Sequence, residues 1–253
     1  VALSSVTASV CTVSLNAVSM HAAGTCTLRA TQPGDSHFNA APISIQSFAV
    51  ARAPQSIVFP VPGARTFGDP ASAVSVSATS GLAVTLVSTT PSICRLSGVT
   101  LTVVAAGTCT VRATQSGDLR YAAALDVLRS LTVSKRPQSI TFSAIGDRGF
   151  DTSAIALVAS ATSGLVVTFS TTTATVCRVS AAMVTLVGVG SCTIRASQAG
   201  SRNDAAAPVV DRTFVVTKGV QSITFVAVAG REFGTGPFNV VASSSSGLAV
   251  SFT

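Results

Sequence analysis

Apolar and polar side chains alternate along most of the chain, in short runs that turn-forming residues separate. In the stretch GTCTVRA (107–113), for example, Cys, Val and Ala alternate with Thr, Thr and Arg. Successive side chains of a strand point to opposite faces of a sheet, so this pattern predicts strands with one buried and one exposed side. We find no stretch of ten residues with a helical period.

The pattern predicts seven short strands between residues 55 and 133, separated mostly by turn-formers such as GARTFGDP, TTPS and QSGD. This spacing of strands and turns is typical of an antiparallel β-sandwich. Gly81, in one of the turns, suits a positive φ. The predicted strands cover 55–59, 73–79, 82–88, 92–96, 99–105, 107–115 and 125–133.

The same phrases return at a fixed interval of 83 residues. AAGTCTLRATQ, AAGTCTVRATQ and GVGSCTIRASQ each carry a cysteine at this interval, and QSIVF, QSITF and QSITF each open with a glutamine at it. An internal repeat takes precedence over local patterns in assigning a fold. The sequence therefore predicts tandem immunoglobulin-like antiparallel sandwiches, with cores of Val, Ile, Leu and two recurring Phe series. These series are Phe59, Phe142 and Phe225, and Phe67, Phe150 and Phe233.

The interval divides the chain into two complete repeats, 54–136 and 137–219, flanked by two incomplete ones. Residues 1–53 match the C-terminal part of a repeat, and residues 220–253 match the N-terminal part. We therefore expect the chain to be a segment of a longer array. No apolar run reaches the 18 or so residues needed to span a bilayer, so we expect no membrane insertion in this segment.

Each repeat with both positions present carries one pair of cysteines with fourteen residues between them, and none is left over. We predict one disulfide per repeat, which would stabilise a small domain by about 3 kcal/mol. Zinc would need closer cysteines or nearby histidines, and a redox pair would need closer spacing at a helix N-terminus. Structural disulfides predict an oxidising compartment outside the cytosol. The predicted pairs are Cys11 with Cys26, Cys94 with Cys109, and Cys177 with Cys192.

The run SGLAVTLVSTTPSICRLSGVTLTVVAAGTCTVRATQSGDLRYAAA, followed by RSLTV, resembles the bacterial immunoglobulin-like repeats, which are related to the stalk domains of intimin and invasin. The resemblance covers the whole chain. Many members have a Trp where this chain has Leu86, Phe169 or Phe252, and small residues where it has the paired cysteines. The resemblance implies a secreted or surface-exposed spacer or adhesive module on the bacterial outer surface.

Motifs that carry chemistry are absent from the sequence, so we predict no enzymatic activity and no cofactor. The recurring Gly-Asp at 34–35 and 117–118 raises a calcium alternative, but the third copy is Gly200-Ser201. The chain has nine acidic residues, and none of them recurs at the same position in every repeat. The sequence therefore does not favour a catalytic pair of carboxylates.

The formal charge of +7 comes mainly from arginines that recur once per repeat. We expect solvated arginines, some paired with Asp69, Asp147 and other nearby acids. Weak binding to an anionic polysaccharide or lipopolysaccharide is an alternative. We expect no nucleic-acid partner, because the aromatics that single-strand binders interleave with basic residues are missing.

Short linkers join the predicted domains, with Pro54 and Pro137 in the first two and Gly219 in the third. We expect an extended, beaded rod with small interdomain contacts that bends most at Gly219. Two functions fit these features: a structural spacer that holds a functional head away from the cell envelope, or a repeated binding module for a glycan or a host or cell-surface protein. Divergence of the loop at 63–69 between repeats favours the spacer. Its partners would then be the neighbouring repeats of the same chain.

Overall fold

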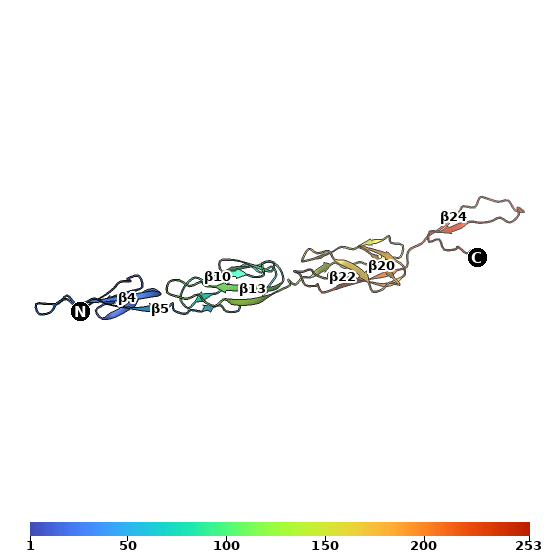
Figure 1. Ribbon diagram of the computed structural model, residues 1–253. Coiled ribbons are helices and arrows are strands. Elements are labelled where there is room, and N and C mark those ends of the chain that lie inside the picture. The colour runs from blue at the N-terminus through green and yellow to red at the C-terminus, as the bar shows by residue number, and fades with distance from the viewer. The chain divides into compact units, whose positions relative to one another are not determined.

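The computed structural model describes residues 1–253 and consists of 25 strands joined by turns and loops, with no helix (Figure 1). The chain divides into two compact units, Val1–Arg136 and Pro137–Thr253. No helix is present that is long and apolar enough to cross a membrane. The fold is all-β, and each unit contains one complete repeat.

The complete repeat 54–136 folds as a sandwich of two layers. In one layer β6 pairs with β9, β8 pairs with β12, and β12 pairs with β11; in the other the order is β10-β13-β14-β7. The strands are β6 (Ile57–Val58), β7 (Arg65–Thr66), β8 (Ser72–Ala73), β9 (Ser77–Ala78), β10 (Thr85–Ser88), β11 (Cys94–Ser97), β12 (Thr100–Val103), β13 (Gly107–Thr114) and β14 (Val127–Ser134).

This pairing is the strand arrangement of an immunoglobulin-like domain. Taking β8 and β9 as one bent strand B, the first layer has the order A-B-E-D and the second the order C-F-G. The short β7 extends the second layer by pairing with β14 in parallel, whereas every other named pair of strands in this repeat is antiparallel. The chain's own topology therefore establishes the predicted fold class.

The second complete repeat, 137–219, has the same strands in the same two layers. The orders are β16-β23-β22-β19 in one layer, and β15-β18 with β17-β21-β20 in the other. Its strands are β15 (Ile140–Phe142), β16 (Arg148–Gly149), β17 (Ile155–Ala156), β18 (Ala159–Ala161), β19 (Thr168–Thr171), β20 (Cys177–Ser180), β21 (Met183–Leu186), β22 (Gly190–Ser197) and β23 (Val210–Thr217).

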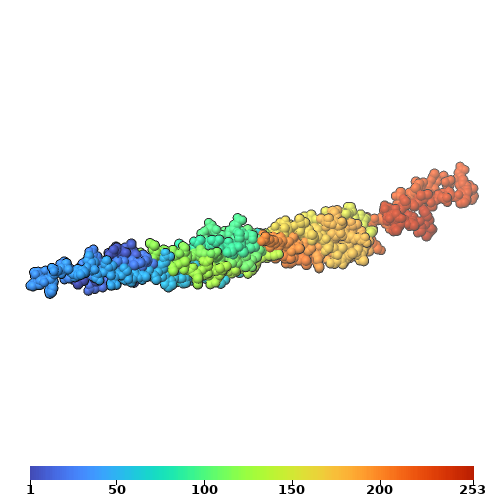
Figure 2. All heavy atoms as spheres, in the orientation of Figure 1, coloured from blue at the N-terminus to red at the C-terminus, as the bar shows by residue number.

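The incomplete repeats form only the strands that their sequences contain. Residues 1–53 form β1 (Ala2–Ser5), β2 (Cys11–Ser14), β3 (Ala17–Met20), β4 (Gly24–Thr31) and β5 (Ser44–Val50), in sheets β1-β4-β5 and β2-β3. Residues 220–253 form β24 (Ile223–Phe225) and β25 (Ala242–Ser244), which pair with each other. In Figure 2 the red atoms of 220–253 form an open loop rather than a filled body.

Each complete repeat has its own apolar core between its two layers. Cys109, Val111 and Ala113 of β13 are fully buried, while Thr108, which precedes them, and Arg112, which lies between two of them, are exposed, as the alternation predicts. The large aromatic side chains of the two cores are Phe59 in the first and Phe142 and Phe214 in the second.

The structure corrects two details of the predicted strands. The predicted strand 73–79 is divided into β8 and β9, because its start pairs with β12 and its end with β6. The predicted turn GARTFGDP contains β7, whose parallel pairing with β14 leaves no signal in the local pattern. Counting β8 and β9 as one bent strand, each complete repeat has the predicted seven strands A to G and one additional short strand, β7 or β16.

The second Phe series does not fill the cores, contrary to the sequence prediction. Phe67 is half-buried beneath the guanidinium of Arg136, with 5.6 Å between the guanidinium carbon and the ring centre. Phe150 and Phe233 are exposed. Phe67 and Phe150 directly follow the short strands β7 and β16 at the edge of the sandwich, whereas no strand precedes Phe233 in the same way, so the repeat interval alone does not determine the burial of these side chains. Gly81 and its two equivalents have the predicted positive φ, with 79° at Gly81.

Candidate functional site

Each of the three disulfides joins a strand of one layer to a strand of the other layer within the same repeat. Cys94 lies on β11 in one layer and Cys109 lies on β13 in the other, with Cα atoms 5.6 Å apart. Their equivalents are bonded in the same way, Cys11 to Cys26 and Cys177 to Cys192, and no cysteine is free. All six side chains are fully buried. The bond therefore clamps the layers together from within the core, where solvent does not reach the sulfurs.

A glutamine at the start of each complete repeat, half-buried in the first and buried in the second, holds one end of the sandwich together. In the second complete repeat, Gln138 is 7% exposed. Its amide nitrogen donates to Gln198 Oε1, at 2.8 Å, and to the carbonyl of Ala205, at 2.6 Å. Its amide oxygen accepts a hydrogen bond from the Ser163 hydroxyl.

The first complete repeat has the same network. Gln55 donates to Gln115 and to the carbonyl of Ala122, and accepts from Ser80. These bonds connect the first strand, the turn before strand C and the loop between strands F and G. Buried amides need such partners, since leaving one unpaired costs about 1–3 kcal/mol. The recurring glutamine is therefore a structural residue of the fold.

The first part of the F–G loop in the first complete repeat, residues 115–122, has a shape set by Gly117 and Asp118. Gly117 has a φ of 75°, and a Cβ there would lie 2.3 Å from the carbonyl oxygen of Tyr121. The Asp118 carboxylate accepts the backbone N–H groups of Tyr121 and Arg120, at 2.8 and 2.7 Å. These two hydrogen bonds, of which the one from Tyr121 has the larger effect, hold the pKa of Asp118 below its usual value.

This geometry gives the recurring Gly-Asp a structural role that differs from the calcium alternative. In the third copy Ser201 replaces the aspartate, and its hydroxyl accepts the N–H groups of Asn203 and Asp204 instead. Either side chain closes the same turn. The structure contains no group of three His, Cys, Asp or Glu side chains placed to hold a metal ion.

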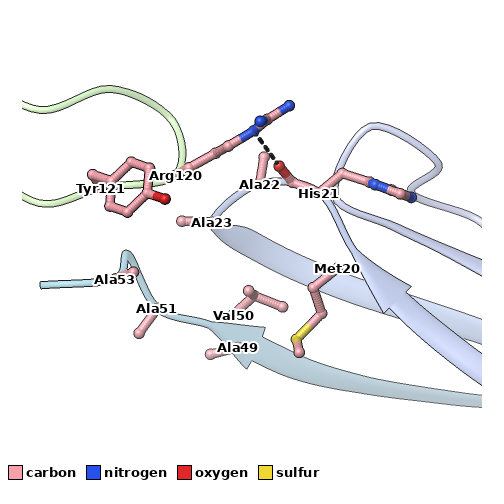
Figure 3. A pocket seen from close by; sticks show the side chains of 10 residues that line it. All are labelled: Met20, His21, Ala22, Ala23, Ala49, Val50, Ala51, Ala53, Arg120 and Tyr121. Carbon is pink, nitrogen blue, oxygen red and sulfur yellow. Dashed lines mark hydrogen bonds between the residues drawn. The ribbon is translucent and has the colours of Figure 1, made fainter. Parts of the chain in front are cut away.

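Within the unit Val1–Arg136, the F–G loop of the first complete repeat contacts residues 1–53 through the main chain. The N–H of Ala23 donates to the carbonyl of Leu119, and the N–H of Ala53 donates to the carbonyl of Arg120, both at 2.8 Å. Ala122 returns a bond to the carbonyl of Ala53 at 2.9 Å. Nε of Arg120 donates to the carbonyl of His21 at 3.1 Å (Figure 3).

An open hollow of about 380 Å³ lies at this contact and is the candidate functional site. Figure 3 shows Arg120 and Tyr121 on the loop facing the alanines of the chain segment 49–53 and of the turn 21–23. The small side chains let the backbones approach closely enough for direct hydrogen bonds. We name these residues the repeat joint: 21–23, 53 and 119–122.

The repeat joint fixes one repeat on the next by main-chain hydrogen bonds, which the short linker alone would not do. The sequence prediction of small interdomain contacts at Pro54 missed the contribution of the F–G loop. The three central residues of this loop are SHF, LRY and RND in the three copies, between a glycine that recurs before them and a pair of alanines that recurs after them. This variation in sequence could have indicated that the loop makes a contact, but a loop without any contact varies in the same way.

Two arginines pair with nearby acids, as expected, but the acids are neither Asp69 nor Asp147. Arg112 bonds to Asp126, just before β14, at 2.7 Å, and Arg195 bonds to Asp211 on the neighbouring strand β23 at 2.9 Å. The hydrogen bond from Arg195 lowers the pKa of Asp211.

The two acids expected to pair with arginines bond to backbone N–H groups instead. Asp69 accepts from Thr66, and Asp147 accepts from Val215. The exposed arginine pairs are spread over both repeats and form no single basic groove.

Comparison with known proteins leaves the family open. No protein-family model matches the chain, and no curated protein matches its sequence. Among solved structures, Drosophila N-cadherin EC1-4 is 12% identical, with a TM-score of 0.29, and the alignment covers 93% of this chain and 73% of that one.

Two further solved structures, of intimin and of a surface layer protein, are also similar to this chain. The D00-D0 domain of intimin is 15% identical over 62% of this chain and 98% of its own, with a TM-score of 0.24. Domains 1-6 of the surface layer protein SbsC are 12% identical over 79% of this chain and 33% of their own, with a TM-score of 0.26. At these scores the similarities carry no argument about function. Membership in the bacterial immunoglobulin-like repeats therefore stays a prediction.

Proposed function

We propose that the chain is a spacer segment of a large bacterial secreted or cell-surface repeat protein, which projects a functional head away from the cell envelope. The observation that carries this proposal is the repeat joint, where the F–G loop bonds one repeat to the preceding one. A spacer must keep its two ends apart, so bending between its repeats has to be limited. Main-chain hydrogen bonds between two repeats limit bending more than a flexible linker alone does.

The disulfides support the same proposal. A cystine between the two layers keeps residues 94–109 from extending when the chain is pulled, which shortens the released length by about 50 Å at roughly 3.5 Å per residue. Disulfides of this kind form in oxidising environments. We accordingly propose an extracellular or surface location, with no enzymatic role.

The spacer proposal is tested by measuring how tightly the repeat joint is held. Spin labels at Ser19 and Thr102, both exposed, report the distance between residues 1–53 and the first complete repeat. We expect a narrow distance distribution in the intact chain and a broad one after Leu119, Arg120 and Tyr121 are all replaced by glycine.

Equivalent glycine substitutions at Ser36, His37 and Phe38 provide the matched control. They alter the F–G loop of residues 1–53, which is exposed and makes no contact with the repeat joint. The distribution should stay narrow in this variant. A broad distribution in the unmodified chain would contradict the proposed spacer. Retention of the intact chain on one glycan of an array, lost in the glycine variant of residues 119–121, would favour the binding module.

A further inference from the structure

The two sulfurs of each disulfide have different polar surroundings. In the first complete repeat, Cys94 Sγ lies 3.4 Å from the hydroxyl oxygen of Ser88 and 3.7 Å from that of Thr90. Cys109 Sγ, the other sulfur of this bond, has no hydrogen-bond partner. A sulfur in a disulfide carries no proton, so the two hydroxyls are the donors in these contacts.

The same pair of hydroxyls recurs at the other two disulfides. In all three copies they lie six and four residues before the first cysteine, in the phrases SVTASVC, STTPSIC and TTTATVC. The distances to the sulfur are 3.3 and 3.8 Å from Ser5 and Thr7 to Cys11, and 3.3 and 3.5 Å from Thr171 and Thr173 to Cys177.

Backbone hydrogen bonds fix the orientation of both hydroxyl groups. Ser88 Oγ accepts the N–H of Thr90 at 3.1 Å, and Thr90 Oγ1 accepts the N–H of Thr110 at 2.9 Å. Because each oxygen is occupied as an acceptor, its own proton is left to point at Cys94 Sγ. Both side chains are half-buried, so water competes little for these protons.

Such donors favour a negative charge on the sulfur that they contact. A neutral disulfide sulfur is a weak acceptor, whereas a thiolate accepts charge-assisted hydrogen bonds that are much stronger. Burial without donors disfavours a thiolate. In thiol–disulfide exchange a thiolate attacks one sulfur and the other departs as a thiolate, faster when that thiolate is stabilised. The two ends of each bond are therefore unequal as leaving groups.

We propose that Cys109 is the sulfur at which a low-molecular-weight thiol attacks this disulfide, and that Cys94 departs as a thiolate bonded by Ser88 and Thr90. The attacking thiolate forms a new S–S bond with Cys109 Sγ. The bond between Cys109 and Cys94 breaks, and its electron pair stays on Cys94 Sγ. The attacking sulfur is oxidised, Cys94 is reduced, and the hydroxyls keep their protons. The equivalent attacked sulfurs are Cys26 and Cys192.

Both sulfurs are fully buried, so attack follows separation of β11 from β13. The segment 88–94 keeps its own hydrogen bonds in this opening, since the N–H of Cys94 bonds to the carbonyl of Thr90 at 3.1 Å. The hydroxyls therefore stay beside Cys94, and β13 carries the mixed disulfide. A thiol attached to Cys109 would occupy the centre of the core, so the repeat stays open until Cys94 attacks Cys109 and expels it. Each disulfide is thus a reversible modification site with a fixed direction.

Brief exchange of the oxidised chain with reduced glutathione tests the direction. The reaction is run in urea below the unfolding midpoint, quenched with acid, and followed by peptide mass spectrometry. We expect about 10-fold more glutathione on Cys109 than on Cys94, and nearly equal amounts in fully denaturing urea. Equal amounts below the midpoint, or the same preference in both solutions, overturn the proposal.

Two variants of one short segment separate the hydroxyls from simple access. The double variant Ser88→Ala, Thr90→Val should reduce the preference for Cys109 below about 2-fold, because the departing thiolate loses both donors. Thr89→Val is the matched control, since the exposed Thr89 hydroxyl bonds to the carbonyl of Thr110 and not to a sulfur. The control should keep the about 10-fold preference. An unchanged preference in the double variant, or an equal loss in both variants, overturns the proposal.

A comparison within the unmodified chain needs no substitution. The Thr171 hydroxyl lies 3.1 Å from the carbonyl of Thr193 as well as beside Cys177 Sγ, so its proton is shared between two acceptors. The preference of glutathione for Cys192 over Cys177 should therefore be smaller, at about 3-fold. A preference in this repeat larger than that for Cys109 over Cys94 would show that the hydroxyls do not set the direction.

Discussion

The second complete repeat and residues 220–253 begin with the same phrase, QSITF, and bury it to very different extents. Phe142 is 3% exposed, whereas Phe225 is 55% exposed. Both phenylalanines lie on a short strand that pairs with the next one in the same register. Local sequence therefore forms the strand pair, but strands that occur later in the repeat provide the cover.

The same two regions differ in their polar contacts. Gln138 is buried and bonds to Gln198 and Ala205, residues 60 and 67 positions further along the chain. Gln221 keeps only the bonds to the nearby serines. The first strands of a repeat thus form local hydrogen bonds by themselves, and their apolar and buried polar contacts depend on strands F and G.

The largest expected effect is a difference in the free energy of unfolding between alanine substitutions at Phe142 and at Phe225. Phe142→Ala should reduce the free energy of unfolding of repeat 137–219 by about 3–5 kcal/mol, because it leaves a cavity in a packed core. Phe225→Ala should leave that free energy unchanged in dilute solution, since its ring is outside this core. Urea unfolding followed by hydrogen exchange of β22 amides measures both. A large loss from Phe225→Ala would show that the two regions share one core.

Removal of the second repeat's disulfide should have the next largest effect. Replacing Cys177 and Cys192 with alanine should destabilise repeat 137–219 by about 3 kcal/mol, because the unfolded chain gains conformational freedom. The repeat should still fold, since its core retains Phe142 and Phe214. The same urea titration monitors the change, and strand pairing of β24 with β25 serves as the internal control. Identical unfolding midpoints with and without the bond would contradict this role.

Gln138→Met should cost about 1–3 kcal/mol, because the Ser163 hydroxyl and the carbonyl of Ala205 lose their partner inside the sandwich. The matched substitution Gln221→Met should have little effect, since that side chain is exposed. Thermal unfolding of the two variants gives the comparison. Equal losses would show that the glutamine acts within its own strand pair rather than through strands F and G.

The smallest effect concerns the F–G loop at the repeat joint. Because the pKa of Asp118 is lowered in the folded chain, its contribution is fully present above the usual aspartate pKa of about 3.9 and is lost as the pH falls through the folded value. The spin-label distance between Ser19 and Thr102 should therefore broaden below about pH 4. Asp118→Asn should remove this pH dependence. Broadening that persists in this variant would indicate another titrating group.

Much of the fold can be predicted from the sequence because its determinants are local or periodic. Alternation identifies β13 and its buried face, and the interval of 83 residues places equivalent positions in each copy. The six cysteines occur as one pair in each of three repeats, and this arrangement predicts which of them are bonded. The positive φ of Gly81 follows from its place in a turn.

The candidate site could be predicted much less well, because it depends on main-chain atoms. Carbonyls of His21, Leu119 and Arg120 form the repeat joint, and every residue type has a carbonyl. The sequence shows Asp118 as an acidic residue after a glycine, but its role as a turn-closing acceptor depends on where the fold places the backbone N–H groups of Arg120 and Tyr121.

By itself the sequence determined that this chain consists of β-repeats with one disulfide in each repeat that has both cysteines. The alternation of apolar and polar residues, the repeat length and the cysteine spacing are all properties of neighbouring or regularly spaced residues. Only the tertiary structure decided that β7 joins β14 in parallel, that Phe67 lies outside the core, and that the F–G loop bonds to the preceding repeat. These contacts join residues far apart in the chain, and their free energy comes from burial and hydrogen bonding that exist only once both layers are assembled.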